Sequence, residues 1–268
     1  MKKALTYITF LDLLFILLLS VSGYFEGIAG NVLYYLAFAI PTCLAFIIKR
    51  YRDVGFSAPK LKISGENLGL TLPIIFPTLA LIFVISFVTS FLLSLFGAEN
   101  NARLSGDIIT LIFTHAFLTS ICEEALFGYV PIALLSPYSK RCAVIFSSVF
   151  FALEHCSLYQ IPYAFAAGLI FCAIDIVCES VIPSLLIHFI NNLISIIWIK
   201  WSDDMRFVWV YVTVIGASAL ISCIFIFLFR KKYKKKISAL LSEKEKIQLS
   251  YAPILFIIMT LVIAVTGI

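Results

Sequence analysis

The sequence has little charge. Of its 268 residues, 13% are Asp, Glu, Lys or Arg and 62% are hydrophobic, and the mean hydropathy is +1.07. Soluble domains carry roughly twice as much charge, about 25%. The composition therefore excludes an ordinary soluble protein and predicts an integral membrane protein. The net charge of +5 does not indicate nucleic-acid binding, because the basic residues flank apolar runs and act there as topology signals.

Familiar site motifs are absent as well. The seven cysteines form no CxxC pair and lie mostly inside apolar runs, as Cys43, Cys122 and Cys172 do, which indicates small core residues and not a zinc site. No HExxH helix is present, so a familiar metal-binding helix is excluded. No Ser or Cys stands beside a histidine in a recognisable nucleophile motif. Carboxylates, histidines and amides remain as the candidates for chemistry.

Long apolar runs dominate the sequence. A membrane-crossing helix needs about 20 mostly apolar residues, which gives about eight or nine spans and predicts an all-α, polytopic membrane helical bundle. The first run starts with two lysines and could pass for a signal peptide, but Asp12 interrupts it, so we interpret it as an uncleaved span. The runs cover residues 4–22, 31–48, 69–97, 107–135, 142–156, 159–178, 180–199, 207–229 and 251–267.

The basic residues predict the orientation of these spans. If the N-terminus is cytoplasmic and all nine runs cross, 17 of the 20 Lys and Arg residues fall in cytoplasmic segments. Only Arg103, Lys200 and Arg206 fall outside. Cytoplasmic loops carry an excess of Lys and Arg, so the bias predicts a multi-pass protein of the cell membrane with a cytoplasmic N-terminus.

Three of the spans carry polar groups at membrane depth, where ionisable side chains mark functional sites by default. At about 1.5 Å per helical residue, Glu124, His155 and His188 lie about 16, 21 and 12 Å from the inner ends of their spans. This agreement predicts that the groups meet at one level, in the cytoplasmic half of the bundle or near its middle. The polar residues are His115, Glu123 and Glu124 in the fourth run, Glu154 and His155 in the fifth, and His188, Asn191 and Asn192 in the seventh.

These residue types suit the hydrolysis of an amide bond. A carboxylate and a histidine that converge on one water form a general base, and a second histidine with an adjacent asparagine amide supplies donors for an oxyanion. Alternatively, two histidines and a glutamate could hold zinc with water in the fourth position. Glu123 and Glu124 diverge by about 100° on a helix, so we expect one to face the site and the other a supporting network.

Three segments together resemble the CPBP family of intramembrane proteases, also called the ABI or CAAX-protease family. This family includes the type II CAAX prenyl endopeptidases and bacterial relatives linked to bacteriocin self-immunity, and it carries the motifs EExxxR, FxxxH and HxxxN in that order. The resemblance covers roughly residues 107–200. The matching segments are EEALFG (123–128), FALEH (151–155) and HFINN (188–192).

The resemblance implies an endopeptidase that cleaves a membrane-associated peptide or protein near the cytoplasmic membrane face. Glu123 and His155 would activate the water, with Glu124 as the supporting carboxylate. His188 and Asn192 would stabilise the oxyanion. This scheme needs no cofactor and none is expected, with zinc as the alternative.

One position departs from the family pattern. The arginine of EExxxR is Gly128 here, so Glu124 lacks the partner that an arginine would supply. The alternative function is therefore a catalytically weak or inactive relative that acts by binding, for example in bacteriocin self-immunity. A proton-coupled transporter is a third hypothesis, which the lack of internal repeats disfavours.

The predicted organisation has three parts. Residues 1–100 hold N-terminal spans, 107–200 the catalytic core, and 207–268 the C-terminal spans. Within the last part, residues 230–250 form a basic cytoplasmic loop. A solvated linker is a simpler interpretation of this loop than specific lipid recognition. The expected partners are the bilayer and a peptide substrate, with no nucleic acid.

Overall fold

The computed structural model describes residues 1–51, 54–97, 106–241 and 251–266. The regular structure in these residues is helical, apart from an isolated bridge between Lys60 and Ser180. The fourth span is one continuous rod of five short segments. The elements are α1 (Lys2–Ser22), α2 (Gly27–Tyr51), α3 (Gly65–Ser94), α4 (Ile108–Leu111), η1 (Ile112–Leu118), α5 (Thr119–Glu123), η2 (Glu124–Tyr129), α6 (Val130–Leu135), α7 (Lys140–Leu153), α8 (Ile161–Cys178), α9 (Ile182–Trp201), α10 (Met205–Leu228), α11 (Arg230–Leu241) and α12 (Tyr251–Thr266).

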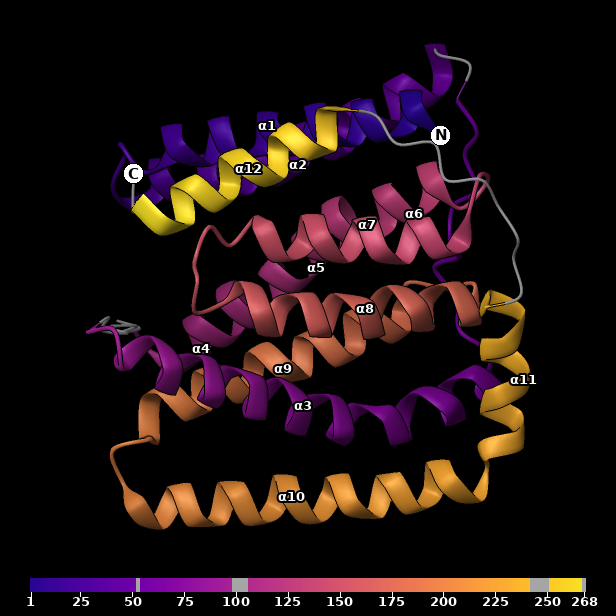
Figure 1. Cartoon of the computed structure of the whole chain (residues 1–268). Helices are drawn as coiled ribbons and strands as arrows, with labels where there is room; N and C mark the ends of the chain where they lie inside the picture. The colour runs from indigo at the N-terminus through magenta and orange to yellow at the C-terminus, as the bar shows by residue number, and fades with distance from the viewer. Residues whose placement is uncertain (52–53, 98–105, 242–250, 267–268) are drawn as a thin grey trace.

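The prediction of an all-α polytopic bundle is confirmed. Seven helical stretches of the described chain are long and apolar enough to cross a membrane. The other two predicted runs form shorter helices, α7 with 14 residues and α12 with 16. In Figure 1 both lie roughly along the long helices, so the nine runs pass back and forth through one slab. The chain is a multi-pass membrane protein.

The helices pack in pairs that hold the slab together. Helix α1 packs on α2 and α12, α3 on α10 and α8, and α7 on α8. Figure 1 shows α1, α2 and α12 along one side, α10 along the opposite side, and α7, α8 and α9 between them. The described part of the predicted basic loop is helical and forms α11, which crosses the right-hand end of the slab. Residues 242–250 of that loop lie outside the described residues.

Two contacts fix the positions of α7, α8 and α9 relative to one another. Gly168 of α8 lies against α7, where an added Cβ would come within 3.0 Å of Ser148 Cα and 3.2 Å of Phe151 Cδ1. The buried carboxylate of Asp175 accepts hydrogen bonds from Ser184 N and Oγ, at 3.0 and 2.7 Å, and thereby ties α8 to the first turn of α9. Both contacts set the position of helices that carry the motif residues.

Replacing Gly168 with leucine is expected to destabilise the protein by about 1–3 kcal/mol, because an overpacked interface must shift. Gly216→Leu in α10 is the matched control, since a Cβ there meets nothing within 4 Å. Thermal unfolding in detergent compares the two variants. Equal melting temperatures for both variants would contradict a close α7–α8 contact.

Candidate active site

A cavity of about 390 Å³ lies between α1 and α2 on one side and α8 and α9 on the other. Four of the five predicted catalytic residues line it, namely Glu123, His155, His188 and Asn192. Glu124 is buried behind this wall. The tertiary structure thus brings the three sequence motifs together around one hollow.

The fourth span leaves regular α-helical geometry where it carries the two glutamates. Glu123 ends α5, and Glu124 begins the π-helical turn η2. Such π-helical turns inside helices occur frequently at functional sites. Of the two glutamates, only Glu123 lines the cavity. This geometry agrees with the expectation that one glutamate faces the site and the other a supporting network.

His188 lies between the two glutamates. Its Nδ1 is 2.8 Å from Glu124 Oε1, and its Nε2 is 3.2 Å from Glu123 Oε2. A ring that donates from both nitrogens carries both protons and a positive charge, and in that state His188 would offset part of the negative charge of the carboxylates. Phe171 stacks on the ring at a centroid distance of 5.3 Å, and Phe151 meets it edge-on at 5.4 Å. Two carboxylates and two aromatic rings therefore fix the orientation of the imidazole.

This contact gives Glu124 a partner that the sequence did not reveal. The family arginine position is Gly128, and an added Cβ there would lie 2.6 Å from Glu124 Oε2. The glycine thus leaves room for the Glu124 carboxylate, which bonds His188 instead. The departure from the EExxxR motif does not leave Glu124 unpaired.

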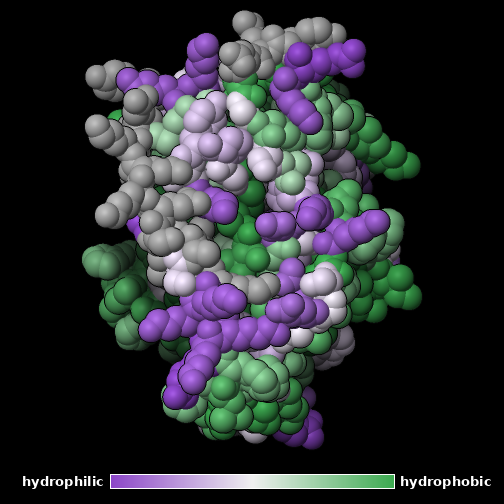
Figure 2. Space-filling model, turned by 90° about the vertical axis from the view of Figure 1, so that its right-hand side faces the viewer, coloured by the Kyte–Doolittle hydropathy of each residue, from purple (hydrophilic) through white to green (hydrophobic). Residues whose placement is uncertain are grey.

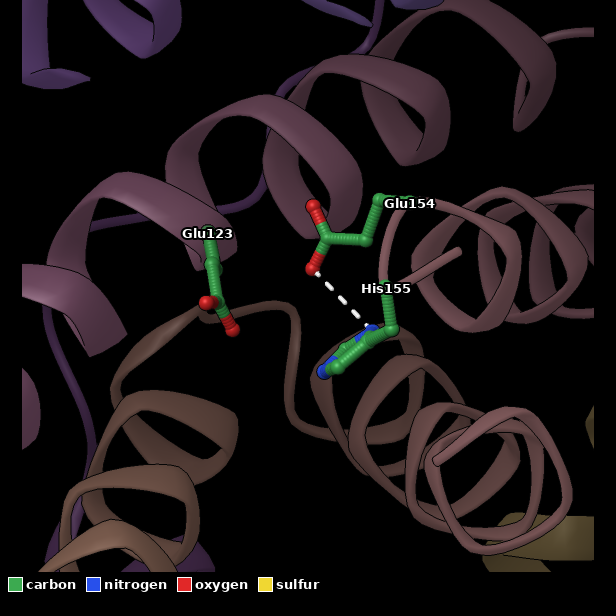
Figure 3. Close-up of side chains that lie close together, drawn as sticks. All are labelled: Glu123, Glu154 and His155. Carbon is green, nitrogen blue, oxygen red and sulfur yellow. Dashed lines mark ion pairs between the residues drawn. The ribbon is translucent and has the colours of Figure 1, made fainter. Parts of the chain in front are cut away.

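A second cluster joins Glu123 to His155 and Glu154. Ligand atoms of these three residues all lie within 4.8 Å of one another. Figure 3 shows the Glu123 carboxylate and the His155 ring facing each other, with the Glu154 carboxylate beside both and linked to the ring by the dashed line. His155 Nδ1 lies 2.9 Å from the Phe151 carbonyl oxygen, which can only accept, so Nδ1 carries a proton. In the neutral form of this ring, the lone pair is therefore on Nε2.

Glu154 lies in this cluster although the sequence motifs assign it no role. It is only 7% exposed, and its Oε1 lies 3.6 Å from His155 Nδ1. Neither carboxylate oxygen makes a hydrogen bond within the described chain. Its place directly before His155 in FALEH was the available signal.

Asn192 faces the fourth span. Its Nδ2 donates to Ser120 Oγ at 3.2 Å and to the His115 carbonyl at 3.4 Å, and its Oδ1 accepts from Asn191 at 3.3 Å. These bonds fix the amide at the cavity wall. His115, which matches no motif, also lines the cavity.

The cluster of Glu123, Glu154 and His155 could hold a metal ion. Two carboxylates and an imidazole are a donor set that zinc accepts. This set differs from the expected pair of histidines with one glutamate, because both nitrogens of His188 already face carboxylates. Among the described residues, this is the group whose ligand atoms come close enough for one ion.

Comparison with known proteins gives one match. Residues 104–194 match the family model of the type II CAAX prenyl endopeptidase Rce1-like proteins. The match covers about a third of the chain and contains all three motifs. Searches of the curated proteins and of the solved structures found no match. The relation suggested by the three motifs is thereby confirmed for this segment.

Proposed function

From the relation of residues 104–194 to a protease family, we propose that the protein is an intramembrane endopeptidase. It hydrolyses a peptide bond of a membrane-associated peptide or protein. The observation that carries this proposal is the convergence of Glu123 and His155 on one cavity. Apolar side chains such as Phe15 and Phe38 line the cavity beside these groups, and charge interactions are stronger in apolar surroundings than in water.

In the proposed reaction, Glu123 and His155 bind one water between them. Glu123 takes a proton from the water as its oxygen attacks the carbonyl carbon of the substrate. The tetrahedral intermediate then collapses, the C–N bond breaks, and the proton passes to the departing nitrogen. General-base catalysis of this kind contributes roughly 10²–10⁴-fold to the rate.

His188 and Asn192 are the proposed oxyanion donors. In the resting geometry, His188 Nε2 faces Glu123. Once Glu123 has taken the proton, its neutral carboxyl attracts this N–H less strongly, so the N–H can turn to the oxyanion. Asn192 supplies a second donor once one of its two Nδ2 hydrogens moves from Ser120 Oγ or the His115 carbonyl to the oxyanion. Glu124 is the supporting carboxylate that holds His188 in place.

Glu154 is proposed to share a proton with Glu123. Two carboxylates this close repel each other when both are ionised, so one proton between them lowers the energy of the resting site. Glu154→Gln is expected to lower the cleavage rate about tenfold, less than loss of a general base, and to shift the acidic limb of the pH–rate profile. Glu179→Gln is the control, because this carboxylate is exposed at the other end of α8. Unchanged profiles for both variants would remove Glu154 from the mechanism.

The proposed scheme activates water without a metal, although the Glu123, Glu154 and His155 cluster would suit one. A bound zinc ion would supply an activated water of its own. Incubation of the purified protein with a chelator, followed by dialysis, is therefore expected to leave the cleavage rate unchanged. Loss of cleavage that returns on addition of zinc would assign the water activation to the ion.

The decisive experiment compares membranes from cells that produce the wild-type protein with membranes that hold an equal amount of the Glu123→Gln variant. New protein N-termini are labelled and identified by mass spectrometry. We expect a set of new N-termini in or beside membrane segments that only the wild type generates. Identical sets from both proteins overturn the proposal in favour of a relative that binds without cleaving.

A further inference from the structure

The cavity lies towards one end of the bundle. Leu19 lines it three residues before the end of α1, Ile199 two residues before the end of α9, and Gln160 directly before α8. Helix α7 is short and stops at Leu153, which places His155 at the same end. In Figure 1 this is the left-hand end of the slab, where the α1–α2, α7–α8 and α9–α10 connections lie.

The basic residues gather at the opposite end. They stand at the start of α1, the end of α2, the start of α7 and along α11. Figure 2 faces this end and shows hydrophilic side chains spread across it. At the cavity end, the described chain has only Lys200 and Arg206. Because cytoplasmic segments are enriched in Lys and Arg, the basic end is the cytoplasmic one.

A layer of close-packed apolar side chains separates the proposed site from the basic end. Beyond Glu124, the rod continues through Phe127, Leu134 and Leu135, which are at most 1% exposed. On α9, Ile187 precedes His188 and is 0% exposed. A peptide that came from the basic end would have to displace these close-packed side chains, whereas the cavity itself leads to the other end.

We infer that the site serves the non-cytoplasmic side of the membrane, so that the substrate is a membrane-anchored peptide segment that enters from outside the cytoplasm. This inference rests on the proposed function. It excludes lipid-modified tails in the cytoplasm and reverses the sequence-based expectation of cleavage near the cytoplasmic face.

The walls of the cavity indicate the chemistry of this segment. The aromatic side chains of Phe15 and Phe38 face it from α1 and α2, and the small residues Ala164 and Ala167 leave room on α8. No lysine or arginine of the described chain lines it. These walls favour an apolar segment next to the cleaved bond and offer no cation to pair with an acidic side chain.

Thiol labelling tests the sidedness without any need for catalysis. Gln160→Cys marks the cavity end and Leu61→Cys the basic end, where Leu61 is 75% exposed. Both are made in a chain whose seven native cysteines are replaced. A membrane-impermeant maleimide is expected to label residue 160 in intact spheroplasts, and residue 61 only after permeabilisation. The reverse pattern, or equal labelling of both in intact cells, overturns the inference.

A second measurement covers the case in which the cysteine-free chain does not fold. An epitope inserted after Asp203, in the short α9–α10 connection of the native chain, is expected to bind antibody on intact spheroplasts. Binding only after permeabilisation contradicts the inference.

The wild-type-specific N-termini should also map to non-cytoplasmic segments of their proteins. Cleavage confined to cytoplasmic segments would overturn the inference about sidedness but would leave the proposed peptidase function standing. If the wild type generated no new N-termini at all, the proposed peptidase function would be overturned and the sidedness would be decided by labelling alone.

Discussion

Glu123→Gln is expected to lower kcat/KM for peptide cleavage by roughly 10²–10⁴-fold, because the amide keeps the shape of the side chain but cannot take a proton from water. The measurement uses purified protein in liposomes with a peptide that spans one of the identified cleavage positions. Binding of this peptide should change little. His188 still has Glu124 as a partner at 2.8 Å, so the variant is expected to stay folded.

His155→Ala should cause a loss of similar size, since it removes the Nε2 lone pair on the other side of the proposed water. Residues that act as a unit are strongly non-additive, so the double variant should be little worse than either single one. His115→Ala is the control, because its side chain lines the same cavity and has no part in the proposed step. Normal cleavage by both Glu123→Gln and His155→Ala rejects the assignment.

His188→Ala is expected to have the largest effect on stability. The ring pairs with two carboxylates and is only 3% exposed. Removal of one partner of a buried ion pair costs about 3–5 kcal/mol, because the remaining charge stays buried without compensation. Thermal or denaturant unfolding in detergent measures this loss, and cleavage should fall at the same time because Glu123 is no longer held.

A double substitution separates the charge effect from lost packing. The double variant His188→Ala with Glu124→Gln no longer has the uncompensated Glu124 charge. Its free energy of unfolding should therefore fall by less than the sum of the losses in the two single variants. Simple additivity would mean that the 2.8 Å contact contributes only through packing.

The sequence by itself determined the fold class and the set of groups that could do chemistry. Hydropathy is a local property, so each apolar run can be recognised without its neighbours, and all nine predicted runs overlap helices of the described chain. The three motifs were equally local, and the depths along their helices predicted that the groups meet.

The partners of these groups were decided only by tertiary packing. The Glu124–His188 contact joins residues 64 positions apart, and it depends on how α8 and α9 are set by Gly168 and Asp175. Glu154 approaches Glu123 because α7 ends at Leu153, directly before Glu154. The sequence does not reveal this helix end, because the apolar run continues up to His155. The end of the bundle to which the cavity leads follows from the same packing. Spacing along one helix fixes which side chains share a face, but it cannot fix which other helix that face meets.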